Sequence, residues 1–269
     1  MNHIQTNTSD EALITAIRAN MGDFFRLVSR ATHEEQFENE RFTRWYTPLT
    51  HPWFNGVLST KPFEEADEAF IAETIRYFRD KGVDTFTWWM DPPLQAADWK
   101  TALSKHGFGF SDDTPGMALD LQTLNESQPP VDGLEIRVVA DEESLRAWTN
   151  VFINGYGLPT DWEDTVFELW GRLGLHFPIQ NYIGYLNGKP VSTSCLFFGG
   201  GAAGIYNVAT LPEARGKGIG AALTLKPLQD ARKMGYRIGT LQSSEMGYNV
   251  YKRLGFRHLC RIENFYLSP

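Results

Sequence analysis

Cysteine is scarce in this sequence: Cys195 and Cys260 are the only two among 269 residues. Two cysteines supply neither a disulfide framework nor the spacing of a zinc site, so the fold must rest on a hydrophobic core. Basic residues are also outnumbered, 25 against 33 acidic ones, which gives a net charge of −8. This balance argues against a nucleic-acid-binding surface, which needs a basic excess or stripe, and favours a cationic partner.

Long apolar runs are missing as well. The first 20 residues are polar and lack the basic head and apolar core of a signal peptide. The most apolar stretch, residues 195–211, is interrupted by glycines and is shorter than the roughly 20 residues of a spanning helix. We therefore expect no membrane contact and a cytoplasmic protein, in keeping with the few cysteines.

The chain has the composition of a globular protein, with 42% hydrophobic and 22% charged residues. Residues 125–133 read NESQPPVDG, with two adjacent prolines and no apolar periodicity, which is typical of a linker. The sequence therefore predicts an N-terminal domain over residues 1–126, a linker over 127–133 and a C-terminal domain over 134–269.

The C-terminal half mixes strands and helices. Periodicity predicts strands over residues 134–139, 181–186, 190–198, 204–210, 237–242 and 258–267. It also predicts a helix capped by Asp141, a second helix capped by Asp161, a third after Arg215 and a short one over 246–254. Asn187-Gly188 predicts a hairpin turn. The expected class is mixed α/β of the α+β kind, because the order is not a strict βαβ alternation.

The N-terminal half repeats parts of this pattern. A helix is expected over residues 64–81 and a strand over 83–90. Gly107-Phe108 precedes Gly255-Phe256 by 148 residues, and Gly82 precedes Gly235 by 153. Two markers at nearly the same offset predict a tandem duplication, with chance similarity of short stretches as the alternative.

The segment that suggests chemistry is NVATLPEARGKGIGAALTL, residues 207–225. A strand ends near Thr210, and a glycine-rich loop leads into a helix. Glycines let backbone N–H groups approach an anion, and the first N–H groups of a helix are unpaired at the positive end of its dipole. This arrangement predicts a phosphate site. The P-loop ending and the dinucleotide-binding spacing are both absent, which disfavours those two nucleotide folds.

ARGKGIG resembles the Arg/Gln-x-x-Gly-x-Gly/Ala pattern of the GNAT superfamily of acetyl-CoA-dependent N-acetyltransferases, over about residues 134–267. The resemblance implies two GNAT-like domains, each a twisted, mostly antiparallel sheet flanked by helices. It implies that the loop holds the pyrophosphate of coenzyme A and the preceding strand its pantetheine arm. The implied cofactor-binding residues are Val208, Ala209, Thr210, Arg215, Gly216, Lys217, Gly218, Ile219, Gly220 and Ala221.

SSEMGYNVYKRLGF is similar to the family's downstream helix, in which a tyrosine precedes Leu-Gly-Phe; here it is Tyr251. Ser244 stands where the family often has a cofactor-binding asparagine. A phenol with a pKa near 10 can protonate the thiolate that an amine expels from a thioester. A packing role is the alternative for Tyr251. The sequence names no general base, since Glu245, His176 and His258 are all better explained as ordinary surface or helix-start residues.

The N-terminal counterpart of the loop reads STKPFEE, residues 59–65, without a glycine cluster. Pro62 has no N–H, and the adjacent carboxylates would repel a pyrophosphate. Leu103 occupies the place of Tyr251 and cannot give a proton. We expect one acetyl-CoA per chain and no metal. The aromatic residues of this half are expected in its core, or alternatively on one wall of the acceptor site: Trp45, Tyr46, Trp53, Phe54, Trp88 and Trp89.

The resemblance implies that the loop GYGLPTDWE, residues 155–163, shapes the acceptor pocket, with Tyr156, Asp161 and Trp162 as candidate contacts. The resulting hypothesis is an N-acetyltransferase that moves acetyl from acetyl-CoA to a primary amine, on a small molecule or peptide, by direct attack in a ternary complex. The alternatives are a non-catalytic coenzyme A-binding sensor or interaction module and a purely structural protein. A tandem chain can mimic a dimer, which favours a monomer.

Overall fold

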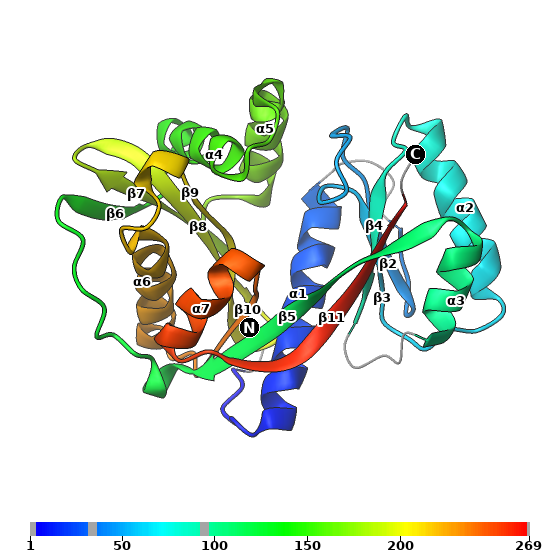
Figure 1. Ribbon diagram of the computed structural model, residues 1–269, viewed down its shortest axis with the longest axis horizontal. Coiled ribbons are helices and arrows are strands. Elements are labelled where there is room, and N and C mark those ends of the chain that lie inside the picture. Colours follow the sequence, from blue (N-terminus) through cyan, green and yellow to red (C-terminus); the bar gives the residue numbers. More distant parts are fainter. Residues whose placement is uncertain (1–3, 32–36, 92–96, 268–269) are drawn as a thin grey trace. The chain divides into compact units, whose positions relative to one another are not determined.

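The computed structural model describes residues 4–31, 37–91 and 97–267, drawn as a ribbon in Figure 1. The chain forms two compact units: unit 1 comprises residues 1–23 and 116–259, and unit 2 comprises residues 24–115 and 260–269. These units differ from the expected domains 1–126 and 134–269. The reason is that α1 (Asp10–Ala31), β5 (Phe108–Asp120) and β11 (Arg257–Leu267) each carry residues of both units.

Unit 1 contains a sheet with the strand order β5-β10-β9-β8-β7-β6. Its strands besides β5 are β6 (Leu134–Val138), β7 (Ile179–Leu186), β8 (Lys189–Gly199), β9 (Ala202–Thr210) and β10 (Ile238–Gln242). All neighbours are antiparallel except β9 and β10, which are parallel. The helices α4 (Glu142–Tyr156) and α5 (Glu163–Leu173) cover one face, and α6 (Ile219–Lys233) and α7 (Glu245–Leu254) cover the other (Figure 1).

The elements predicted for the C-terminal half are confirmed, with small shifts at their ends. Asp141 caps α4: its carboxylate accepts from the Ser144 N–H at 2.8 Å. Asn187 and Gly188 turn the β7–β8 hairpin with φ of 50° and 80°. Asp161 does not cap α5, because a short 3₁₀ turn, η2 (Thr160–Trp162), precedes that helix and places Asp161 inside the turn.

The expected linker is fastened to unit 1 at both of its ends. The carboxylate of Glu126 accepts from Arg232 at 2.5 Å and from Gln229 at 2.6 Å, both on α6. The Asn187 N–H donates to the carbonyl of Gly133 at 2.9 Å. The segment therefore runs beside α6 as part of the unit.

Unit 1 also includes the first half of α1, a helix that was not predicted from the sequence. Asn20 is fully buried at the end of the β8–β9 hairpin. Its Nδ2 donates to the carbonyls of Phe197, Gly199 and Ala202 at 3.4, 3.0 and 3.2 Å, and its Oδ1 accepts from the Tyr206 hydroxyl at 2.8 Å. One amide thereby satisfies backbone groups that the end of the hairpin would otherwise leave buried and unpaired.

Unit 2 has the strand order β1-β2-β3-β4-β11-β5. Its own strands are β1 (Phe37–Glu38), β2 (Phe42–Trp45), β3 (Gly56–Ser59) and β4 (Phe86–Met90), with the helices α2 (Asp67–Asp80) and α3 (Ala97–Lys105). The parallel strands β3 and β4 are joined through α2. This repeats the β9–α6–β10 connection of unit 1.

The glycines that suggested a duplication lie at matching places. Gly82 and Gly235 follow α2 and α6, and Gly107 and Gly255 follow α3 and α7. All four have positive φ, between 73° and 105°. Each unit therefore ends its equivalent helices with a left-handed glycine.

Aromatic residues dominate the core of unit 2, where Phe86, Trp88 and Trp99 are fully buried. Trp45 and Phe54 are buried too, whereas Trp53 is 53% exposed, so the expectation of core packing holds for only part of that set.

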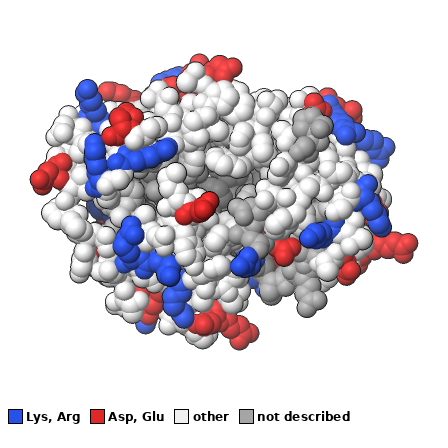
Figure 2. All heavy atoms as spheres, in the orientation of Figure 1, with Lys and Arg blue, Asp and Glu red and all other residues white. Residues whose placement is uncertain are grey.

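Among the described residues, no helix is both long and apolar enough to cross a bilayer. On the face drawn in Figure 2, acidic side chains lie among the basic ones.

Candidate functional site

Strands β9 and β10 separate part-way along unit 1. Their parallel pairing ends at Ile205 and Leu241, whereas β9 continues to Thr210. A register shift against β8 lies in the same stretch, where Asn207 has a φ of 53°. Val208, Ala209 and Thr210 therefore lie on a length of β9 that is not paired with β10, where backbone groups can meet a ligand.

Side chains bind the carbonyl oxygens along this part of β9, which remains paired with β8. The donors are the hydroxyls of Thr193, Tyr156 and Ser192 and the Nε of Arg215. They reach the carbonyls of Asn207, Val208, Ala209 and Thr210 at 2.9, 3.2, 2.6 and 3.0 Å, respectively. Together with the pairing to β8, these bonds fix the part of β9 that β10 no longer supports.

The glycine-rich loop follows directly. After β9 comes the 3₁₀ turn η3 (Pro212–Ala214), then Arg215, and then Gly216 and Gly218 with φ of 76° and 81°. Gly218 caps α6 without a side-chain hydrogen bond, and the first turn of α6 has no acidic residue. A Cβ added to Gly216 would meet nothing within 4 Å, so the loop borders open space.

The start of α6 leaves donors for an anion. The Ala222 N–H donates to the carbonyl of Gly218 at 3.1 Å, so the N–H groups of Ile219, Gly220 and Ala221 precede the regular helical bonds. Such groups, together with the helix dipole, favour a phosphate. The residues of this loop therefore fit the pyrophosphate expected from the sequence.

The two basic side chains of the loop bind backbone carbonyl oxygens. Arg215 donates to the carbonyls of Thr210 and Gly155 at 3.0 and 2.8 Å, and Lys217 donates to the carbonyl of Glu213 at 3.1 Å. These acceptors are neutral, and neither cation forms an ion pair with another described residue. The positive field at the loop is therefore not cancelled locally.

The end of α4 lies directly against β9. A Cβ on Gly155 would lie 2.9 Å from the Cβ of Ala209, so only glycine allows this approach. Tyr156 follows and donates its hydroxyl to the carbonyl of Val208. Burial, and to a smaller extent the nearby Tyr251, raise the pKa of Tyr156 above its usual range. The candidate acceptor contact Tyr156 is thus committed to the strand, while Asp161 and Trp162 lie in η2, where Asp161 is exposed.

Tyr251 lies on α7 and is 8% exposed. Burial raises the pKa of its phenol to about 12, so the group carries its proton at neutral pH. Ser244 is the N-cap of the same helix, and its hydroxyl accepts from the Gly247 N–H at 3.2 Å. That role needs only a small polar side chain, which accounts for serine at this position.

Two glycines of the site, Gly155 in α4 and Gly247 in α7, have packing roles that were not predicted from the sequence. Glycine inside a helix is unfavourable and often marks a close approach of another group. That pattern could have singled out both positions.

The sequence of residues 143–256 matches the model of the Acetyltransferase (GNAT) family. This part of the chain is a GNAT domain. The prediction from the ARGKGIG loop is therefore confirmed at the level of the family. No curated protein sequence is a significant match to the chain.

Solved structures match the fold of nearly the whole chain. A GCN5-related N-acetyltransferase from Kribbella flavida has a TM-score of 0.68 at 19% identity, over 93% of this chain and 96% of that one. A tandem GNAT protein from the clavulanic acid biosynthesis pathway has a TM-score of 0.58 at 13% identity, over 99% and 98%. The predicted class, mixed α/β with tandem GNAT-like halves, is thus confirmed as a fold.

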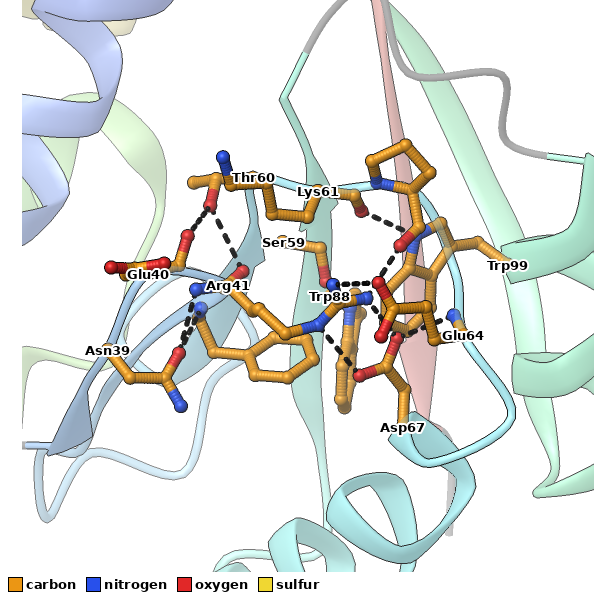
Figure 3. A network of polar contacts seen from close by, with 12 residues as sticks. Asn39, Glu40, Arg41, Ser59, Thr60, Lys61, Glu64, Asp67, Trp88 and Trp99 are labelled. Atoms are coloured by element: carbon orange, nitrogen blue, oxygen red, sulfur yellow. Dashed lines mark hydrogen bonds and ion pairs between the residues drawn. The ribbon is translucent and has the colours of Figure 1, made fainter.

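The counterpart of the phosphate loop in unit 2 lies between β3 and α2, and its own side chains fill it (Figure 3). Arg41 donates to both carboxylate oxygens of Asp67 at 3.0 and 2.6 Å and to Glu64 at 2.7 Å. Asp67 also accepts from the Glu64 N–H at 2.8 Å. An internal ion pair therefore occupies the helix start where the GNAT domain presents free N–H groups.

Proposed function

We propose that the GNAT domain transfers acetyl from acetyl-CoA to a primary amine, by direct attack in a ternary complex. One observation carries this proposal: a single unit contains the uncapped glycine loop at the start of α6, the end of β9 that lies beyond its pairing with β10, and the buried phenol of Tyr251. Acetyl-CoA has a group for each of these features: its pyrophosphate for the loop, its pantetheine arm for β9 and its sulfur for Tyr251.

Backbone groups supply most of the binding. Gly216, Gly218 and the N–H groups of Ile219, Gly220 and Ala221 would hold the pyrophosphate, with the charges of Arg215 and Lys217 beside them. The backbone of Val208, Ala209 and Thr210 would hold the pantetheine arm. This division supports binding of the common part of any acyl-CoA and leaves the acyl preference to other residues.

Tyr251 is the group that we assign to proton transfer. Bound acetyl-CoA supplies an activated acyl group whose sulfur must leave as a thiol. The Tyr251 phenol is protonated at neutral pH because burial holds its pKa near 12. It can therefore donate a proton to the departing sulfur, an assistance typically worth roughly 10²–10⁴ in rate.

The acceptor is an amine on a small molecule or peptide. Asp161 and Glu163 add negative charge near the α4–α5 connection, which attracts an ammonium group. Tyr156 and Trp162 remain the candidates for its apolar part. We further propose a monomeric, cytoplasmic protein, since the tandem chain supplies two GNAT-like units by itself.

Unit 2 is proposed not to bind acetyl-CoA. Its helix start carries Asp67 and Glu68, and Arg41 is already paired with the carboxylates there. Leu103, at the place of Tyr251, is fully buried and cannot donate a proton. The expected stoichiometry is one acetyl-CoA per chain.

Release of coenzyme A thiol from acetyl-CoA, measured over a broad panel of amines, tests the proposal. Thermal unfolding with acetyl-CoA measures binding separately, and ligand at 100 times Kd should add about 2.7 kcal/mol of stability. Turnover with any amine supports the enzyme. Binding without turnover across the panel would favour the non-catalytic sensor, and absence of binding would reject both.

A further inference from the structure

Gly247 lies under the ring of Tyr251. The two residues are four apart on α7, and a side chain in a helix leans back over the turn that precedes it. A Cβ built on Gly247 would lie 2.6 Å from Cε2 of Tyr251, 3.1 Å from Cζ and 3.2 Å from the hydroxyl oxygen. The far edge of the ring therefore rests on the helix backbone where glycine leaves it bare.

The ring has little freedom to move away from this position. Tyr251 is 8% exposed and belongs to the main hydrophobic core of unit 1. Phe256 meets it edge to face, with ring centroids 6.0 Å apart. Because the surroundings are close-packed, an atom added beneath the ring must push it out of place.

Backbone conformation does not explain the glycine. Gly247 is not among the residues with positive φ, so any amino acid could adopt its conformation. Its N–H donates to the Ser244 hydroxyl, a bond that alanine would keep. Alanine is also a far better helix former than glycine. The contact with Tyr251 is what remains to favour glycine here.

The direction of the ring matters for chemistry. Leaning over Gly247 carries the hydroxyl toward the N-terminal end of α7, which follows the end of β10 at Gln242. That end lies where β9 has already separated from β10. The electrostatic influence of Tyr251 on Tyr156, whose hydroxyl binds Val208, agrees with this direction.

We propose that Gly247 is a positioning residue: its missing side chain is the slot that sets the Tyr251 hydroxyl at the reacting sulfur. This inference rests on the proposed acetyl transfer for its consequence but not for its geometry. A displacement of about 1 Å at a reacting group can lower a rate by roughly 100-fold.

The test is Gly247→Ala, with Gly171→Ala as the matched control. Gly171 also lies inside a helix, α5, but a Cβ there would meet no atom closer than 3.8 Å. We expect Gly247→Ala to lower kcat at least tenfold while the Kd for coenzyme A stays within twofold. Gly171→Ala should match the wild type in both.

A double-variant comparison separates positioning from general damage. In a Tyr251→Phe background the hydroxyl is gone, so adding Gly247→Ala should lower kcat less than twofold further. Equal losses in both backgrounds, or a single variant within twofold of the wild type, would overturn the proposal. If the Gly247→Ala protein does not fold, the double variant Gly247→Ala with Tyr251→Leu should fold, because it lacks the Tyr251 ring. A double variant that also fails to fold would count against the slot.

A second readout does not depend on activity. Carbon-13-labelled tyrosine gives one Cζ resonance per ring, and Tyr251→Phe identifies that of Tyr251. Gly247→Ala should shift this resonance, and Gly171→Ala should not. A shift in a protein that shows no acetyl transfer would leave the slot intact and reject the proposed function, whereas an unmoved resonance in an active enzyme would reject the slot.

Discussion

The side-chain oxygen of Asn20 accepts a hydrogen bond from the hydroxyl of Tyr206 at 2.8 Å. The same amide donates to carbonyl oxygens of Phe197, Gly199 and Ala202 at the end of the β8–β9 hairpin. A residue near the start of the chain thus completes the polar interior of a domain whose family match begins at residue 143.

Asn20→Asp should be strongly destabilising. It keeps the shape of the side chain but replaces the donor with a carboxylate that faces three carbonyl oxygens, and each unmet buried group costs about 1–3 kcal/mol. We expect the free energy of unfolding to fall by about 3 kcal/mol or more in urea denaturation. Tyr206→Phe removes one bond only and should cost less. Similar small losses in the two variants would contradict the account.

Two substitutions of Gly216 that have nearly the same shape but differ in charge test the phosphate loop. Gly216 has positive φ and open space around it, and asparagine and aspartate both tolerate that conformation. Gly216→Asp should weaken coenzyme A binding at least tenfold relative to Gly216→Asn, because it adds a negative charge beside the pyrophosphate. Isothermal titration calorimetry measures both. Equal affinities would mean that the anion does not lie at this loop.

Tyr251→Phe tests the proton donor. The ring and its packing remain, so the Kd for coenzyme A should stay within twofold while kcat falls by roughly 10²–10⁴. Steady-state kinetics with the best amine of the panel provides the measurement. An unchanged kcat would assign the proton transfer to another group.

The pH dependence follows from the raised pKa of Tyr251. An exposed tyrosine, as in the unfolded chain, loses its proton near pH 10, whereas the folded protein holds that proton up to about pH 12. Its contribution to stability is therefore complete below pH 10 and is lost between pH 10 and 12. The kcat should not fall through Tyr251 below pH 10. A decline with an apparent pKa near 8 that disappears in Tyr251→Phe would disprove this assignment.

Unit 2 gives a prediction for stoichiometry. Calorimetry should find one coenzyme A per chain, because the start of α2 is filled by Arg41 and its carboxylate partners. Arg41→Met should lower the melting temperature, since Asp67 is buried and loses its bidentate partner, and it should not create a second site. Two equivalent sites in the wild type would contradict the proposal that unit 2 does not bind coenzyme A.

Local chemistry made much of the GNAT domain predictable. The Asp141 cap, the Asn187-Gly188 turn and the glycine loop act through a few neighbouring residues, and their sequence patterns are correspondingly sharp. Asp161 was wrong as a helix cap because a 3₁₀ turn extends the helix by one turn at little energetic cost, which leaves no distinct pattern.

Features that depend on distant contacts were not predictable. Helix α1 was missed although its apolar residues recur at helical spacing, and what its sequence does not reveal is the contact of Asn20 with the β8–β9 hairpin, far away along the chain. The bond from the Tyr156 hydroxyl to the Val208 carbonyl was not predictable either, because nothing in the neighbouring sequence reveals that acceptor. The two compact units were not predictable for the same reason. Their boundaries fall inside the strands β5 and β11, so the two ends of each strand pack in different units.

The last ten residues, 260–269, belong to the unit that otherwise spans residues 24–115. During synthesis the earlier part of that unit leaves the ribosome long before the strand that finishes its sheet. Unit 1 in turn begins with residues 1–23 and must wait for residues 116–259. Neither unit can complete its fold from one continuous stretch of chain, so unit 1 must wait for residue 259 to be synthesised and unit 2 for the residues after it. For the same reason, a single proteolytic cut would not release either unit intact.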